Sequence, residues 1–298
     1  MKSKFCLFLV HFFLTLIFFS CLSEHSEHLA PEDKYGSKKS LVDRYFPEIQ
    51  GHRGCRGLYP ENSIEGFLAA IDLGVDVLEL DVAVSKDSMV LVSHEPWLNP
   101  EICSDVNGDP LGNLPYCMIK YNLFAMDYNE IERFHCGMSE YDRFPLQKKI
   151  NTYKPLLSDV LLQVEQHCKA IDMPMPKFNI ELKYLDSSNG IFHPDANSFA
   201  RLVLEVTQEH DQLCTYQSFS TSQLEALHAL HPGELVYLIE NDESLQDNLA
   251  KISFIPAVYS PNHEVLNPDY ISEAQSASMK CIPWTVNNQE RMKELIEW

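Results

Sequence analysis

Two short stretches of this sequence place acidic and basic side chains at alternate positions between apolar residues. Glu79 and Asp81 are two residues apart in "VLELDV", and Glu181 and Lys183 have the same spacing in "FNIELKY". Successive side chains of a β-strand point to opposite faces, so each pair shares one face of its strand. Adjacent ionised carboxylates need a cation, a shared proton or water, and carboxylate oxygens suit Ca²⁺ or Mg²⁺. The spacing predicts a divalent-metal site beside a lysine, with an exposed strand face or a cross-strand ion pair as the alternatives.

Two histidines lie at the ends of other strand-like runs. His52 precedes Arg53 and Gly54, and His94 follows the run "VLVS". Imidazole exchanges protons near neutral pH, and the guanidinium fork of arginine binds phosphate oxygens. Either histidine alone would more often be a structural hydrogen-bonding residue. Together with three carboxylates, an arginine and a lysine, they form the set required for metal-assisted cleavage of a phosphodiester.

Strand-like runs alternate with helical patterns from residue 46 onward, which is typical of a parallel α/β sheet or barrel. The helical pattern "SIEGFLAAIDLG" has Pro60 before it and Gly74 at its end, as expected of helix start and stop signals. A further helix is predicted around 158–168. The predicted strands are 48–51, 77–84, 90–92, 177–182, 213–217, 235–239, 257–260 and 281–286.

The connection between the second and third predicted strands is too short for a parallel crossover. Only "SKDSM" joins them, whereas a parallel crossover needs about a dozen residues. The third strand must therefore return antiparallel, which brings His94 back towards Glu79 and Asp81. Seven parallel strands then remain, and the sequence ends at Trp298 within a helical pattern. We expect an eight-stranded α/β barrel that is truncated before its last strand, with a natural seven-stranded enzyme as the alternative.

The sequence around these residues resembles the glycerophosphodiester phosphodiesterase family. The likeness runs through "GHRGCRGLYPENSIEGFLAAIDLGVDVLELDVAVSKDSMVLVSHEPWL" and continues, in the expected order, through "IELK", "QSFS" and "IPWTVN". The resemblance implies a TIM (β/α)8 barrel over residues 45–298, with an insertion at about 98–176. It also implies hydrolysis of glycerophosphodiesters, which are deacylated phospholipids, to an alcohol and sn-glycerol 3-phosphate.

The resemblance further implies a role for each matching residue. The implied roles are the acid/base pair (His52, His94), the ligands of Ca²⁺ or Mg²⁺ (Glu79, Asp81, Glu181), the phosphate-binding cations (Arg53, Lys183), an ancillary ligand or orienting group (Glu61) and a wall of the glycerol site (Trp284). A place in the apolar core is the alternative for Trp284. The family often has Asp where this chain has Glu95, and it usually ends on a strand with a Thr-Asp pair, which is absent after Trp298.

Two other functions fit parts of this pattern. One is a related barrel phospholipase of the phosphoinositide or sphingomyelinase D type. The other is a lipid-anchored protein that binds glycerophosphodiesters without cleaving them. Binding alone would need only the cations and a pocket wall, so the presence of both histidines and all three carboxylates favours an enzyme.

The first residues of the chain predict export. Two lysines precede an apolar run over residues 5–19, which is short for a membrane span of ~20 residues and suits a secretory signal. Ser20-Cys21 resembles the bacterial lipoprotein box. We therefore expect a signal peptide over 1–20, a lipidated Cys21, a flexible tether over 21–44 and a periplasmic or cell-envelope lipoprotein. An ordinary cleaved signal or a membrane anchor is the alternative.

Charge and cysteine content restrict the partners. The net charge of −20 argues against nucleic acid as a partner, because an acidic surface repels polyanions. The charge does not indicate the oligomeric state. The cysteines after Cys21 have neither metal-site nor disulfide-framework spacing. Cys103 and Cys117 flank a turn-rich loop and could pair in an oxidising compartment, with free thiols as the alternative.

Overall fold

The computed structural model describes residues 47–298. The predicted signal peptide, the lipidated Cys21 and the tether lie outside the described residues. Within residues 47–298, no helix combines the length and the apolar character that a membrane span requires.

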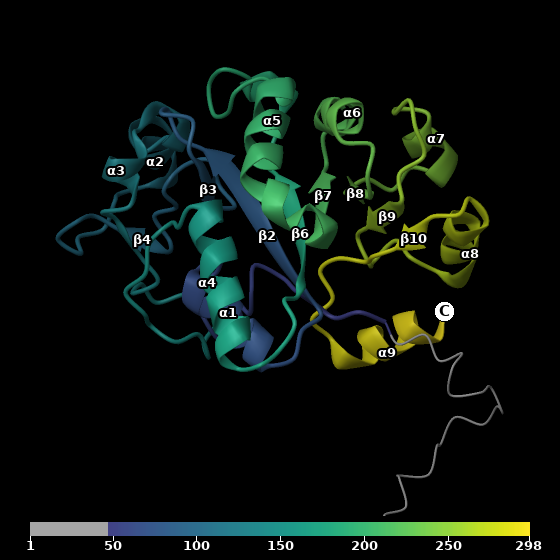
Figure 1. Cartoon of the computed structure of the whole chain (residues 1–298), viewed down its shortest axis with the longest axis horizontal. Coiled ribbons are helices and arrows are strands. Elements are labelled where there is room, and N and C mark those ends of the chain that lie inside the picture. Colours follow the sequence, from purple (N-terminus) through teal and green to yellow (C-terminus); the bar gives the residue numbers. More distant parts are fainter. Residues whose placement is uncertain (1–46) are drawn as a thin grey trace, which may run out of the picture. The chain divides into compact units, whose positions relative to one another are not determined.

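The described residues form a curved sheet with helices along its outer side (Figure 1). The strands are β1 (Gln50–Gly51), β2 (Val77–Val84), β3 (Val90–Val92), β4 (Cys103–Ser104), β5 (His135–Cys136), β6 (Lys177–Leu182), β7 (Cys214–Ser218), β8 (Leu235–Ile239), β9 (Val258–Pro261) and β10 (Lys280–Cys281). The α-helices are α1 (Ile64–Asp72), α2 (Leu114–Lys120), α3 (Tyr128–Ile131), α4 (Leu157–Ala170), α5 (Ala196–Thr207), α6 (Thr221–Leu230), α7 (Leu245–Leu249), α8 (Pro268–Ser276) and α9 (Gln289–Glu297). The 3-10 helices are η2 (Leu123–Ala125), η3 (Asp186–Ser188) and η4 (Gln208–Leu213).

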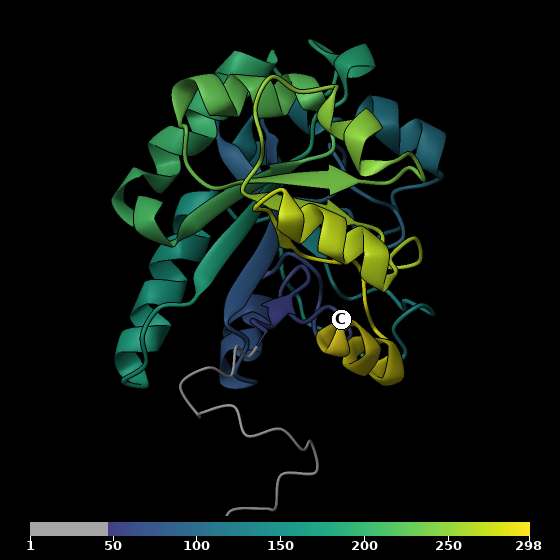
Figure 2. The same ribbon diagram turned by 90° about the vertical axis from the view of Figure 1, so that its right-hand side faces the viewer.

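The main sheet is mostly parallel and curls into a half-barrel, which is visible again after a quarter turn (Figure 2). Its parallel strands follow the order β1-β2-β6-β7-β8-β9-β10, and β3 lies beside β2. The β3 strand runs antiparallel, with Val92 opposite Val82, as the short connection predicted. Within the described residues, β1 and β10 are the two edges of the sheet. The α/β barrel class expected from the sequence is confirmed.

The last predicted strand is shorter than expected. The sequence predicts residues 281–286, but β10 ends at Cys281 and only an isolated bridge joins Trp284 to Asn262. Pro283 lies between them and has no backbone N–H to donate to a strand partner, which explains why the ladder stops.

Helix α1 connects β1 to β2 and shows why the barrel elements form as the sequence predicts. Ser63 caps its first turn by accepting a hydrogen bond from the Gly66 N–H at 3.0 Å. Phe67 and Ile71 are spaced four residues apart on the buried side of the helix. They join the main core together with the apolar side chains of β2, such as Leu80. Burial of this apolar stripe fixes the turn after β1 relative to β2.

The segment between β3 and β6 contains a second, smaller core. Leu98, Leu123 and Ile131 are fully buried in it. The helix predicted over 158–168 is α4, and its buried side chains belong to the main core instead. Most of the predicted insertion therefore packs around this second core, which also takes in Ala83 of β2 and Leu91 of β3, and the last helix of the insertion joins the main core.

The disulfide in this segment differs from the candidate pair. Cys103 is bonded to Cys136, and Cys117 is a buried free thiol. Cys103 and Cys136 lie directly opposite each other where β4 pairs antiparallel with β5. The pairing of Cys103 with Cys117, which the sequence left open, does not form, because the partner of Cys103 is set by this strand register, whereas Cys117 lies on α2.

Candidate active site

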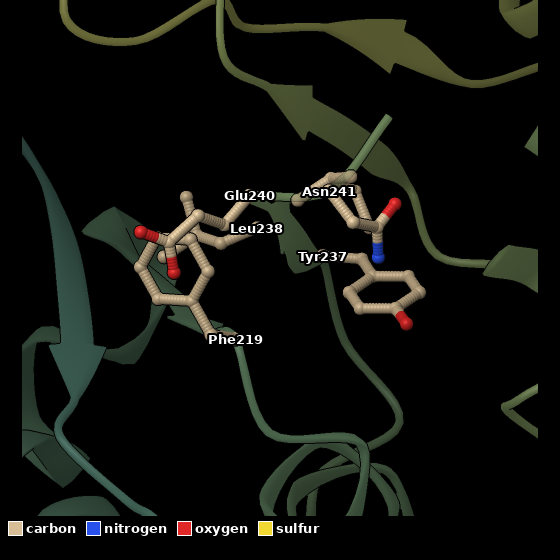
Figure 3. Close-up of a pocket in the computed structure, with 6 residues that line it drawn as sticks. Phe219, Tyr237, Leu238, Glu240 and Asn241 are labelled. Carbon is tan, nitrogen blue, oxygen red and sulfur yellow. The ribbon is translucent and has the colours of Figure 1, made fainter. Parts of the chain in front are cut away.

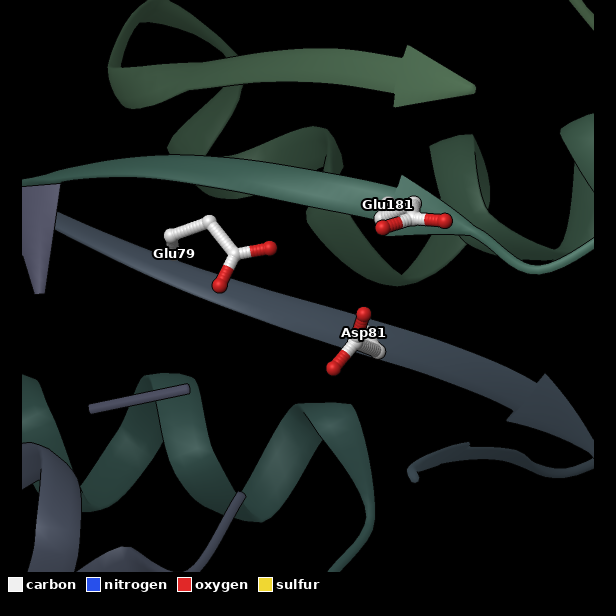
Figure 4. A group of neighbouring side chains, drawn as sticks. All are labelled: Glu79, Asp81 and Glu181. Carbon is white, nitrogen blue, oxygen red and sulfur yellow. The ribbon is translucent and has the colours of Figure 1, made fainter. Parts of the chain in front are cut away.

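Three buried carboxylates lie together on one face of β2 and β6 (Figure 4). The register of the two parallel strands places Asp81 directly opposite Glu181, and Glu79 precedes Asp81 by two residues. One oxygen from each of the three lies within 4.8 Å of the others. We refer to this face of the two strands as the acidic face.

The electrostatics of the acidic face fit a cation. Burial, reinforced by the charges of Asp81 and Glu181, raises the pKa of Glu79 to about 8. Burial also raises the pKa of Glu181. Among the described residues, the buried Asp81 Oδ1 has an ion-pair partner, Lys183, but accepts no hydrogen bond of good geometry. Three clustered carboxylates are a donor set that suits Ca²⁺ and Mg²⁺, so the cluster could hold a divalent metal ion.

Lys183 lies among these carboxylates. Its Nζ is 2.6 Å from Glu181 Oε1 and 3.0 Å from Asp81 Oδ1. Burial alone would lower the pKa of Lys183, but the charges of Asp81 and Glu181 outweigh it and raise the pKa. Burial would likewise raise the pKa of Asp81, but Lys183 and Arg53 hold it well below its usual range. An ionised Asp81 and a charged lysine therefore lie side by side at the carboxyl ends of β2 and β6.

The turn after β1 brings His52 and Arg53 to the same site. Arg53 has a positive φ of 53°, and its backbone N–H donates to Glu79 Oε2 at 2.8 Å. Gly54 follows with a φ of 81°, and a Cβ there would lie 2.9 Å from the Gly66 backbone, so only glycine fits. His52 Nε2 is 3.9 Å from the same Glu79 oxygen. Burial lowers the pKa of His52 to about 3, which keeps the ring neutral at neutral pH.

The side chain of Arg53 is held between two acids. Its Nη1 donates to Glu61 Oε1 at 2.9 Å, and its Nε is 3.3 Å from Asp81 Oδ2. Arg56 Nη1 donates to the second oxygen of Glu61 at 3.4 Å. Glu61 therefore orients two arginines and lies outside the three-carboxylate cluster, which fits the orienting alternative of the sequence prediction.

Two amide side chains support the carboxylates and were not singled out from the sequence. Asn62 Nδ2 donates to Asp81 Oδ2 at 2.8 Å, and Gln217 Nε2 donates to Glu79 Oε1 at 2.9 Å. Both amides are buried. The available signal was their position, because Asn62 follows Glu61 in the Pro-Glu-Asn triplet and Gln217 begins "QSFS".

The β3 hairpin returns His94 to this end of the sheet. The N–H of Ser93 donates to Asp81 O at 2.9 Å, which ties the backbone next to His94 to β2. His94 lies close enough to Asp81 and Glu181 to contribute to lowering the pKa of both carboxyl groups. His94 Nδ1 is 2.9 Å from Glu95 Oε1. The structure thus brings together both histidines, three carboxylates and two cations of the sequence prediction.

A cavity of about 350 Å³ opens beside the acidic face, at the ends of β7 and β8 (Figure 3). Phe219, which lines it, has its ring centroid 6.0 Å from Lys183 Nζ. Trp284 packs edge-to-face on Phe219 at 5.3 Å and donates from Nε1 to Ser260 O at 2.9 Å. Trp284 therefore supports a wall of this cavity through Phe219. The remaining lining residues are Tyr237, Leu238, Ile239, Glu240 and Asn241.

Comparison with known proteins gives a consistent result. Residues 52–298 match the model of the glycerophosphoryl diester phosphodiesterase family. The chain belongs to this family. The assignment to a family of phosphodiester hydrolases made from the sequence is therefore confirmed.

Individual relatives agree with this membership. A glycerophosphodiester phosphodiesterase of Bacillus subtilis is 26% identical over 254 residues, which cover 83% of this chain and 79% of the relative. The structure of a protein assigned as a glycerophosphoryl diester phosphodiesterase from Silicibacter pomeroyi superposes with a TM-score of 0.73 at 23% identity, covering 85% and 89% of the two chains. An Oleispira antarctica phosphodiesterase, solved with its product sn-glycerol 3-phosphate, gives a TM-score of 0.65 at 19% identity, covering 84% and 89%. The two structures show the fold.

Proposed function

We propose that the protein is a divalent-metal-dependent phosphodiesterase that hydrolyses glycerophosphodiesters to an alcohol and sn-glycerol 3-phosphate. The observation that carries the proposal is the meeting of three carboxylates with two imidazoles and two cations at the carboxyl ends of β1, β2 and β6. Active sites of α/β barrels lie at this end of the strands. The product bound to the Oleispira antarctica relative supports the substrate class.

The histidines supply the acid and the base of the proposed reaction. One imidazole takes the proton of the attacking hydroxyl, and the other gives a proton to the leaving alcohol oxygen. If the glycerol 2-hydroxyl attacks phosphorus, this half-reaction gives a cyclic phosphate and the free alcohol. Water then opens the cyclic phosphate with the proton transfers reversed, which yields sn-glycerol 3-phosphate.

The acidic face binds the metal ion and positions the phosphate in this proposal. Glu79, Asp81 and Glu181 would hold Ca²⁺ or Mg²⁺, which stabilises negative charge on phosphate oxygens when it is bound. Arg53 and Lys183 would bind the same phosphate oxygens. The cavity beside Phe219 would receive an organic part of the substrate.

The test is the release of glycerol 3-phosphate from glycerophosphocholine. His52→Ala and His94→Ala should each lower kcat by about 10²–10⁴-fold with folding intact, because each removes a proton-transfer group. His210→Ala, in η4, is the matched control and should keep wild-type activity. Wild-type turnover in either active-site variant would remove that histidine from its role. Assays with intact phosphatidylinositol and sphingomyelin test the phospholipase alternatives, because only such an enzyme would cleave these lipids. Tight binding of glycerophosphocholine without release of glycerol 3-phosphate would indicate the non-catalytic binding protein.

We also propose that the protein is exported and anchored through Cys21 at the cell envelope. The sequence of residues 1–21 supports this proposal. Membrane fractions should contain the full-length wild type, and Cys21→Ala should shift it to the soluble or unprocessed fraction. An identical distribution of the two proteins would argue against the anchor.

A further inference from the structure

Lys154 is a buried charge to which the proposed reaction assigns no role. It lies in the segment between β3 and β6, and only 2% of it is exposed. Within the described part of the chain, its Nζ has no hydrogen-bond partner. Burying an unpaired ammonium group is costly, whereas an apolar side chain would fill the same place at no such cost. A lysine at this position therefore suggests that its charge acts on a neighbouring group.

The group on which this charge acts is Glu95. Its Oε2 is also buried without a hydrogen-bond partner among residues 47–298, and its Oε1 lies 2.9 Å from Nδ1 of His94. Burial alone would raise the pKa of Glu95, but the hydrogen bond to His94 and the charges of His94, Lys154 and Arg53 lower it to about 2. The carboxylate is therefore ionised at neutral pH and can only accept hydrogen bonds.

An ionised Glu95 decides which nitrogen of His94 carries the proton. Since the carboxylate only accepts, Nδ1 of His94 must donate, and Nε2 is left free to exchange protons with a substrate. A protein usually fixes the tautomer and the ring orientation of a functional histidine in this way. One ring nitrogen donates a hydrogen bond to a carboxylate, and the other nitrogen faces the site.

The backbone holds Lys154 next to the hairpin that carries His94. The N–H of Val92 on β3 donates to the carbonyl of Pro155 at 2.8 Å. The hydroxyl of Tyr128 donates to the carbonyl of Lys154 at 3.2 Å. The antiparallel bridge between Leu91 and Leu156 therefore places Lys154 opposite Ser93, beside the hairpin residues His94 and Glu95, although they are far apart in the sequence.

We propose that Lys154 is a positioning residue whose positive charge anchors Glu95 against His94 and so fixes the ring nitrogen that His94 presents to the phosphate. The proposal rests on the proposed role of His94 as acid or base. It gives the predicted insertion over residues 98–176 a part in the reaction, although that insertion supplies none of the metal ligands or acid/base residues.

The first test replaces Lys154 with Met, which keeps the volume and removes the charge. We expect Lys154→Met to lower kcat for glycerophosphocholine by about 10–100-fold with KM changed less than about twofold. Lys154→Arg should keep most of the activity. Lys149→Met is the matched control, since Lys149 is an exposed lysine of the same segment paired with Glu140. A raised KM with unchanged kcat would overturn the proposal, because it would place the charge of Lys154 on the substrate.

A double-mutant cycle tests whether Lys154 acts through Glu95. In a Glu95→Gln background, Lys154→Met should cause no further loss of kcat, because the charge it removes has lost its target. Equal losses in the two backgrounds would overturn the proposal. Circular dichroism checks folding throughout, and Lys154→Gln takes the place of Lys154→Met if the methionine variant is unfolded.

Nitrogen-15 NMR of the histidine rings tests the proposal without activity. The His94 signals are assigned as those missing from the spectrum of His94→Gln. In the wild type, the ring of His94 should be a single tautomer with its proton on Nδ1. In Lys154→Met, it should be a mixture of tautomers. An unchanged His94 spectrum would overturn the inference whatever the activity. Absence of glycerol 3-phosphate from the wild type would instead count against the proposed function, so the two failures are distinguishable.

Discussion

The two faces of β2 carry opposite kinds of side chain. Leu78, Leu80 and Val82 point to one face and are completely buried in the main core. Glu79 and Asp81 point to the other, where they are buried among charges. We refer to the first as the apolar face. Strand β6 repeats the arrangement, because its Ile180 and Leu182 also lie in the main core.

This difference separates stability from chemistry within single strands. Burial of the apolar face stabilises the fold by about 25 cal/mol for each Å² removed from water. The acidic face opposes folding, because like charges are buried together, and it persists where a bound cation or a function compensates. Substitutions on the two faces should therefore have separable effects, and the predictions below test that separation.

The largest expected effect is on the acidic face. Glu181→Gln should lower kcat/KM for glycerophosphocholine by about 10²–10³-fold, because it removes one charged oxygen donor while the amide oxygen still contacts Lys183. The free energy of unfolding in urea should change by less than about 1 kcal/mol. Glu165→Gln, at a partly exposed position of α4 that pairs with Lys169, should leave both quantities near the wild type. Nearly full activity in Glu181→Gln would contradict the claim that the acidic face carries the chemistry.

The apolar face should show the reverse pattern. Leu80→Ala is expected to lower the free energy of unfolding by about 2–5 kcal/mol, because it leaves a cavity in the main core. The remaining folded protein should keep kcat/KM within a few-fold of the wild type. Leu162→Ala, at a 47% exposed position of α4, should cost less than about 0.5 kcal/mol. Equal costs at the two positions would contradict the assignment of Leu80 to the core.

The Cys103–Cys136 bond lies outside both faces and extends the comparison to the segment between β3 and β6. Cys136→Ala should lower the free energy of unfolding by about 2–4 kcal/mol with little change in kcat, since the bond restricts the unfolded chain. Adding a reductant should reproduce this loss in the wild type and in Cys117→Ala, because Cys117 is a free thiol. Stability that is insensitive to reductant in the wild type would count against the bond.

The smallest effect concerns the pH dependence of stability at Glu95. Its folded pKa of about 2 lies below the ordinary value of 4.5, so its contribution to stability is present above pH 4.5 and is lost as the pH falls towards 2. Urea unfolding of the wild type over this range should therefore show a steeper loss of stability than that of Glu95→Gln. Parallel curves of unfolding free energy against pH for the two proteins would mean that His94 and Lys154 do not stabilise the ionised carboxylate of Glu95.

Much of this site follows from local sequence pattern. The alternation in β2 and β6 predicts that Glu79, Asp81 and Glu181 share faces, because strand periodicity is a local property. The place of His94 follows from connection length alone, since five residues allow only a hairpin. The strands and the parallel order of the barrel were predictable for the same reason.

The remaining features depend on contacts between distant parts of the chain. Cys136 pairs with Cys103 because of the register of two very short strands, and no local sequence pattern predicts that register. Asn62 and Gln217 reach the carboxylates from a turn and from a third strand. Lys154 has the sequence appearance of a surface lysine and is buried only because its segment folds back along β3. Long-range packing therefore decides which groups support the acidic face.

The most direct test of the central claim is metal dependence measured on the wild type and on Glu181→Gln together. The account predicts that exhaustive chelation abolishes glycerol 3-phosphate release by the wild type, that Ca²⁺ or Mg²⁺ restores it, and that calorimetry detects the ion binding to the wild type much more tightly than to the variant. Undiminished hydrolysis by the chelated wild type would contradict the account.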